Sequence, residues 1–130
     1  MSQENVEIVR RINAAYRRGD WEVLPEFWDP DILIRTDARW PEQRVHGRDA
    51  ALALYRGLWE SGGSDVRIEE IVDLGDRVLV RFGVSMRGQQ SGIEVQQSVS
   101  EIVTFREGRI IFVEYFLDHD QARKAVGLEE

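Results

Sequence analysis

The second half of the chain consists of four strand-like segments that follow one another with only short turns between them. In residues 77–87 every second position from Val78 to Met86 is apolar, a period typical of a β-strand with one buried face. The other three segments cover residues 66–74, 93–105 and 109–117. Consecutive long strands joined by short turns pair antiparallel with their neighbours, and such a sheet twists and curls.

The first half of the chain is mainly helical. Residues 3–18 and 48–60 each carry an apolar stripe at helical spacing. A short helix at 20–27, a strand at 32–36 and a final helix capped by Asp118 complete the order of elements. This order predicts an α+β fold, in which a curved antiparallel sheet has the N-terminal and central helices packed on its concave side around a pocket.

Composition limits the classes of partner and cofactor. The 130 residues fit a single domain, residues 1–130. The net charge of −7 argues against nucleic acid and against an anionic membrane surface. The chain has no cysteine, and its two histidines are far apart, so we expect no metal site and no cofactor. The start of the chain does not resemble a secretion signal, and we expect a cytoplasmic protein.

Four stretches carry a resemblance that spans essentially the whole chain. In order, they are SQENVEIVRRINAAYRRGDWEVLPEFWDPDI, VHGRDAALALYRGLW, VDLGDRVLVRF and FREGRIIFVEYFLDHDQARKAVGL. With this order and spacing, the chain resembles a SnoaL-like protein of the nuclear transport factor 2-like superfamily, which also contains steroid delta-isomerases and polyketide cyclases. The resemblance implies a cone-shaped sheet with a pocket at its open end and frequent homodimers, but it does not imply one activity.

The steroid isomerases of this superfamily suggest three catalytic candidates. In those enzymes a carboxylate base moves a proton next to a carbonyl, while a tyrosine and a protonated carboxylic acid hold the developing oxyanion. The resemblance places Tyr16 at the tyrosine and Glu101 at the acid, where the family has aspartate. Counting from the turn at residues 29–31 places Thr36 at the base. Threonine cannot abstract a proton unaided, so we consider Asp37 as the base if a bulge turns it inward.

Each candidate also has a structural interpretation. Glu101 lies on the more apolar face of its strand and should point inward, where a carboxylate either has a raised pKa or forms an ion pair, for instance with Arg35 or Arg81. Tyr16 could be a core tyrosine bonded to the backbone. Asp37 could be a solvated loop carboxylate.

Further residues are candidates for contacts with a ligand, although aromatic side chains of this kind are also common in plain cores. These ligand-binding candidates are Trp28, Thr36, Trp40, Trp59, Gln97 and Tyr115.

The last strand pattern, residues 109–117, is apolar on both faces. The alternation places Ile110, Phe112 and Phe116 on the outer face, which predicts a homodimer through the sheet unless the final helix covers it. Three hypotheses on function remain. The protein is an acid–base enzyme acting on a small apolar carbonyl or polyketide-like compound, a non-catalytic binding module for a small apolar molecule, or a dimeric interaction domain.

Overall fold

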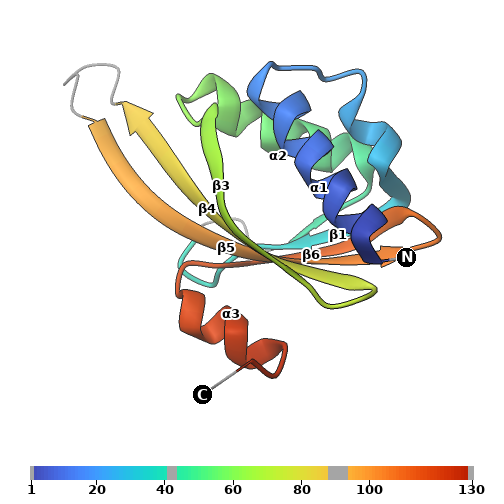
Figure 1. Ribbon diagram of the computed structural model, residues 1–130. Helices are drawn as coiled ribbons and strands as arrows, with labels where there is room; N and C mark the ends of the chain where they lie inside the picture. The colour runs from blue at the N-terminus through green and yellow to red at the C-terminus, as the bar shows by residue number, and fades with distance from the viewer. Residues whose placement is uncertain (1, 41–43, 88–93, 129–130) are drawn as a thin grey trace.

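The computed structural model describes residues 2–40, 44–87 and 94–128, and its strands form one six-stranded sheet (Figure 1). The strands are β1 (Trp28–Arg35), β2 (Arg44–His46), β3 (Asp65–Asp73), β4 (Arg77–Arg87), β5 (Glu94–Arg106) and β6 (Arg109–Phe116). The helices are α1 (Ser2–Arg17), the 3-10 helix η1 (Leu24–Phe27), α2 (Arg48–Glu60) and α3 (His119–Ala125).

The strand order is β2-β1-β6-β5-β4-β3. The predicted α+β class and the curved sheet are therefore confirmed, although β1 and β6 pair in parallel and the sheet is mixed. β2 was not among the predicted elements, and β1 begins at Trp28, four residues before the predicted start. The turn expected at residues 88–92 lies outside the described residues.

Register shifts occur in three of the described strand pairs: one lies in the β1–β6 pair between Trp28 and Leu33, and the other two are one-residue bulges. In the β3–β4 pair the register shifts around Glu69. In the β5–β6 pair Phe105 faces Ile110 but Thr104 faces Phe112, so Ile111 is the extra residue. A bulge increases the local twist and changes which side of the sheet the following side chains face. The sheet curves around α1 and α2, which lie together on its concave side (Figure 1).

The main core fills the space between these helices and the sheet. Ile32 and Ile34 of β1 and Val78 and Val80 of β4 are fully buried there, as the alternation predicts. Val9 and Ala15 of α1 and Ala51 of α2 are buried from the opposite side. None of the described helices is long and apolar enough to cross a lipid bilayer.

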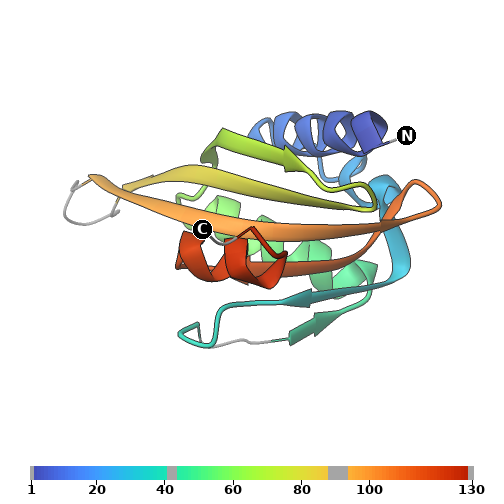
Figure 2. The same cartoon turned by 60° about the horizontal axis from the view of Figure 1, so that its bottom comes forward.

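The outer face of the sheet is partly covered by α3 (Figure 2). Ala122 packs there with Leu79, Ile102 and Phe116 in a second, smaller cluster. The final helix therefore covers Phe116, which was one of the two interpretations of this apolar face. Ile110 was placed on the wrong face by simple alternation, because the bulge at Ile111 lets it join the main core.

The start of α3 is fixed by two side chains. The Asp118 carboxylate caps the helix by accepting the Asp120 N–H at 2.9 Å. His119 Nδ1 lies 2.6 Å from Ser100 Oγ on β5, and its Nε2 lies 3.4 Å from Glu70 Oε1. His119 is partly buried, and its contacts hold α3 against the sheet.

Candidate active site

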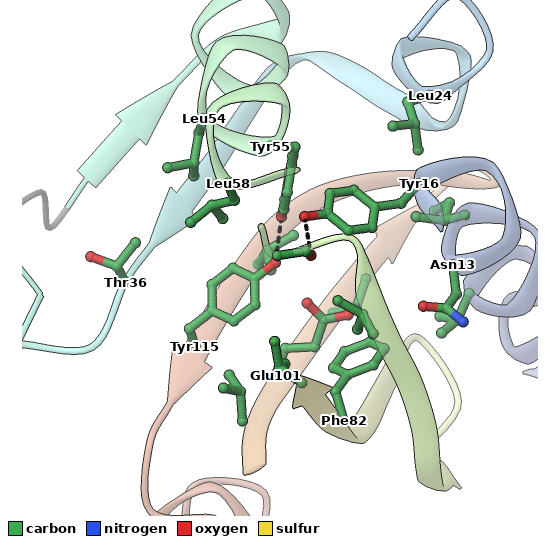
Figure 3. Close-up of a pocket in the computed structure, with 18 of the residues that line it drawn as sticks. Asn13, Tyr16, Leu24, Thr36, Leu54, Tyr55, Leu58, Phe82, Glu101 and Tyr115 are labelled. Atoms are coloured by element: carbon green, nitrogen blue, oxygen red, sulfur yellow. Dashed lines mark hydrogen bonds between the residues drawn. The ribbon is translucent and has the colours of Figure 1, made fainter. Parts of the chain in front are cut away.

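A cavity of about 590 Å³ lies between α1, α2 and the concave face of the sheet (Figure 3). Most of its lining is apolar, and much of it is aromatic. Its polar groups belong to Asn13, Tyr16, Thr36, Tyr55, Gln97, Glu101, Tyr115 and the indoles of Trp28 and Trp40. Glu101 is the only charged side chain among the described residues of the lining.

Glu101 enters the cavity from the middle of β5, between Val99 and Val103 on the same face. It is 9% exposed. Burial raises the pKa of its carboxyl group to about 7, against a smaller lowering by a hydrogen bond from Tyr115. A carboxyl group with a pKa near neutrality can both give and take a proton under ordinary conditions.

The two arginines considered as partners of Glu101 pair with other carboxylates. Arg35 Nη2 lies 2.6 Å from Glu114 Oε1, and Arg81 Nε lies 3.6 Å from Glu69 Oε1. Their strand positions place all four side chains on the outer side of the sheet or at its edge. The structural ion pair expected as an alternative for Glu101 is therefore not formed with either arginine.

Glu101 ends a chain of three hydrogen-bonding side chains. Tyr115 lies directly opposite Glu101 in the β5–β6 pair and forms a side-chain hydrogen bond with it. The hydroxyls of Tyr115 and Tyr55 are 2.6 Å apart. When Glu101 is ionised, its carboxylate can only accept a hydrogen bond. Tyr115 then donates its one proton to Glu101, and Tyr55 donates to the Tyr115 oxygen. Burial raises the pKa of both phenols, which keeps them protonated as donors.

The bulge at Ile111 creates this pairing. Without it, the turn would place Glu114 opposite Glu101, and two carboxylates would face each other across the strands. With it, Tyr115 occupies that position and Glu114 turns to the outer face, where it meets Arg35. Tyr55 was not among the predicted site residues. Its place on the apolar stripe of residues 48–60 was the available signal, but a stripe does not show which hydroxyl finds a polar partner.

Tyr16 lines the cavity, but its hydroxyl already has a partner. It donates to the Gly63 carbonyl oxygen at 2.7 Å, and burial raises its pKa to about 12. Its ring packs edge-on against Trp21 and Tyr55. Gly63 fits tightly here, since a Cβ at this position would lie 2.8 Å from the Leu58 carbonyl oxygen. This arrangement matches the structural interpretation of Tyr16.

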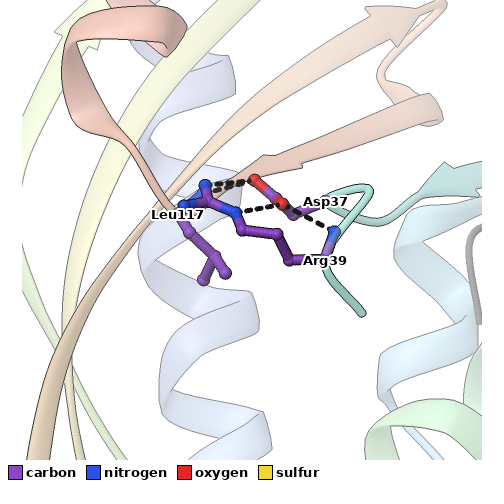
Figure 4. A network of polar contacts seen from close by, with 3 residues as sticks. All are labelled: Asp37, Arg39 and Leu117. Carbon is purple, nitrogen blue, oxygen red and sulfur yellow. Dashed lines mark hydrogen bonds and ion pairs between the residues drawn. The ribbon is translucent and has the colours of Figure 1, made fainter. Parts of the chain in front are cut away.

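Asp37 lies outside the described lining, in a polar network at the end of β1 (Figure 4). Its carboxylate accepts Arg39 Nε at 2.8 Å, Arg39 Nη2 at 2.9 Å and the Leu117 N–H at 2.9 Å. These donors hold the pKa of Asp37 well below its usual range. The structure therefore shows Asp37 tying the segment after β1 to the end of β6. Thr36, one residue earlier, lines the cavity.

The other predicted ligand contacts divide into two groups. Trp28, Trp40, Gln97 and Tyr115 line the cavity, and the Trp40 ring lies 5.7 Å from that of Tyr115. Trp59 is not in the described lining, because its ring packs edge-on against Trp21 and lies beside Gly19, just after the end of α1. The described residues contain no cluster of three histidine, aspartate or glutamate side chains suited to a metal ion.

The curved sheet, the helices on its concave side and the enclosed apolar cavity define a pocket protein of the nuclear transport factor 2-like fold. A model of the SnoaL-like domain matches residues 9–113, and the chain belongs to this family. The predicted resemblance is thereby confirmed. No curated protein matches the chain.

Three solved structures illustrate the similarity. Bal32a, from a soil-derived mobile gene cassette, has a TM-score of 0.79 at 23% identity, covering 88% of this chain and 89% of its own. An NTF2-like protein from Burkholderia xenovorans LB400 has a TM-score of 0.73 at 26% identity, covering 89% and 90%. A protein of ketosteroid isomerase-like fold from Catenulispora acidiphila DSM 44928, in complex with trimethylamine, has a TM-score of 0.75 at 15% identity, covering 95% and 94%. Three further similar structures carry names that only suggest an activity. These names are a polyketide cyclase, a hydroxylase and an isomerase.

Proposed function

We propose that the protein binds a small, largely apolar carbonyl compound in the cavity and that Glu101 acts on it as an acid, as in a cofactor-independent isomerase or cyclase. The observation that carries this proposal is one buried carboxyl group with a pKa near neutrality inside an otherwise apolar cavity. Names of similar structures that include a cyclase and an isomerase agree with it. Perturbed carboxyl groups in clefts are frequently functional.

The neutral form of Glu101 would act on the carbonyl oxygen. One carboxyl oxygen accepts the Tyr115 hydrogen bond, and the other carries the proton that a ligand carbonyl can accept. As the α C–H bond of the ligand breaks, its proton passes to water and the electron pair moves onto the carbonyl oxygen. The acid stabilises that oxygen, and the α-carbon takes a proton back from solvent. Tyr16 and Asp37 have no role in this proposal, because their polar atoms already serve the fold.

The proposal predicts that the protein accelerates exchange of α-protons for deuterium in 2-tetralone, measured by proton NMR in D₂O. We expect Glu101→Gln to lower the protein-dependent rate by about a hundredfold, the usual scale of general acid catalysis. Glu114→Gln is the matched control, since it removes a carboxylate beside Tyr115 that points away from the cavity. Glu114→Gln should keep the wild-type rate, and full exchange activity in Glu101→Gln would contradict the proposal.

A non-catalytic binding module is the second candidate. It is favoured by one observation: the described lining has no second carboxylate to serve as a base opposite Glu101. The same experiment separates the two candidates. If 2-tetralone binds to the wild-type protein without faster exchange, the cavity is a binding site only.

We also propose that two copies associate through the outer face of the sheet. Leu33 of β1 and Phe112 of β6 are register partners on this face. Both side chains remain partly exposed, because neither belongs to the cluster under α3. Sedimentation equilibrium should give twice the chain mass of 15.1 kDa. We expect Phe112→Glu to give the single-chain mass, and a monomeric wild-type protein at micromolar concentration would refute the association.

A further inference from the structure

Among the residues that the structure describes, none gives Glu101 a positively charged partner. Buried carboxylates in proteins are normally paired with a cation, because ionisation without a partner is costly. Among the described residues that line the cavity there is no lysine, arginine or histidine. The groups that face Glu101 are the phenols Tyr115 from β6 and Tyr55 from α2, with apolar Phe82 from β4. From α1, Asn13 and Tyr16 are neutral. The described part of the cavity wall thus supplies hydrogen bonds to this carboxylate but no positive charge.

The walls around this carboxyl group are aromatic. The aromatic side chains of the described lining are Tyr16, Trp28, Trp40, Tyr55, Phe82 and Tyr115. The rings of Trp28 and Tyr55 are 5.6 Å apart, and those of Trp40 and Tyr115 are 5.7 Å apart. Ring faces attract an organic cation, most strongly where water is excluded. An anionic ligand would instead meet a carboxylate and negative ring faces, so the cavity selects against it.

We propose that the ionised form of Glu101 binds the head group of an organic ammonium compound, with the apolar body of that compound filling the rest of the cavity. The cation would supply the missing countercharge, and the aromatic rings would replace the water that it loses. The inference shares with the proposed function the premise that the cavity is a ligand site. It adds a second ligand class, bound by the opposite protonation state of the same residue. Carbonyl compounds and organic cations would therefore compete for the cavity. Low pH would favour the carbonyl compound, which needs neutral Glu101, and high pH would favour the cation.

This linkage has a definite sign. A permanently charged ligand requires the carboxylate, so its affinity should rise as Glu101 loses its proton. Because burial places the pKa of Glu101 at about 7, the ionised fraction and hence the association constant should increase about tenfold between pH 6 and pH 8. A neutral ligand of the same shape should gain nothing over this interval.

The test uses two probes of nearly identical shape that differ in charge, benzyltrimethylammonium and neopentylbenzene. Binding is followed by the fluorescence of the wild-type protein, since Trp28 and Trp40 line the cavity. We expect the cation to bind at least tenfold more tightly than the neutral probe at pH 8 and to lose this advantage at pH 6. In Glu101→Gln the cation should lose its pH dependence and most of its affinity, while the neutral probe stays within about twofold. Glu114→Gln should behave as wild type.

The outcomes separate the two proposals. If the neutral probe binds as tightly as the cation at pH 8, the ammonium inference is wrong and the proposed carbonyl function is unaffected. If the cation binds equally well at pH 6 and pH 8, Glu101 is not its partner and the inference is also wrong. If neither probe binds, the cavity is not a ligand site and both proposals fail. The comparison within the wild-type protein holds even if the Glu101→Gln variant does not fold.

Discussion

The Glu101→Gln variant is expected to become more stable relative to the wild-type protein as the pH rises from 4 to 8, by about 3 kcal/mol. Burial raises the pKa of Glu101 from 4.5 to about 7, whereas the unfolded chain releases this proton near 4.5. Between these two values the native state binds more protons than the unfolded state, so an increase in pH favours unfolding. The free energy of unfolding of the wild-type protein therefore falls between pH 4.5 and about pH 7 and does not fall further above that range. The variant shows no such fall, because glutamine does not titrate.

Urea unfolding of both proteins at pH 4, 6 and 8 measures the difference directly. At pH 4 the two proteins should differ little, because neutral Glu101 and glutamine have similar size and polarity. The control is Glu107→Gln, which removes an exposed carboxylate in the β5–β6 turn that water already solvates. A constant difference between Glu101→Gln and wild type across the three pH values would show that Glu101 ionises in the fold at no cost. The ammonium inference would then lose its main premise.

The sequence was sufficient to predict the side of the sheet that Glu101 faces. Strand alternation depends only on the backbone period of two, and the side chains of Val99, Glu101 and Val103 follow it. Thr36, the residue after β1, continues the alternation of Ile32 and Ile34: all three are buried, and Thr36 lines the cavity. Alternation stops being informative where the strand ends. β1 ends at Arg35, so the direction of Asp37 depends on its bonds to Arg39 and Leu117 rather than on pleating.

The partners of Glu101 could not be derived in the same way. They depend on a one-residue bulge at Ile111, and no residue type in that strand requires one. They also depend on where α2 sits over the sheet, because this position brings the Tyr55 hydroxyl to Tyr115. An apolar stripe shows which face of a helix is buried, but the neighbour of each buried side chain is set by tertiary packing. This difference explains why Trp59, on the same stripe, packs against Trp21 instead of the cavity.

We expect Tyr115→Phe to raise the pKa of Glu101 above its wild-type value of about 7. The phenol is the hydrogen-bond donor to the carboxylate, and a bond to a charged group contributes about 1.5–3 kcal/mol. Its loss should therefore raise the pKa by about one to two units. Phenylalanine keeps the ring that packs against Trp40, so the burial of Glu101 changes little. Carbon-13 NMR of labelled protein, with the Glu101 signal assigned from Glu101→Gln, follows this titration.

Tyr55→Phe tests the direction of the chain of hydrogen bonds. If Tyr55 donates to Tyr115 and Tyr115 donates to Glu101, removing the Tyr55 hydroxyl leaves the bond to the carboxylate in place. The pKa of Glu101 should then rise less than in Tyr115→Phe, because only the polarisation of Tyr115 by its neighbour is lost. Equal rises in the two variants would mean that Tyr55 itself is needed to hold Tyr115 against Glu101. An unchanged pKa in Tyr115→Phe would mean that the phenol does not stabilise the carboxylate, and the bulge would then have no electrostatic consequence for the cavity.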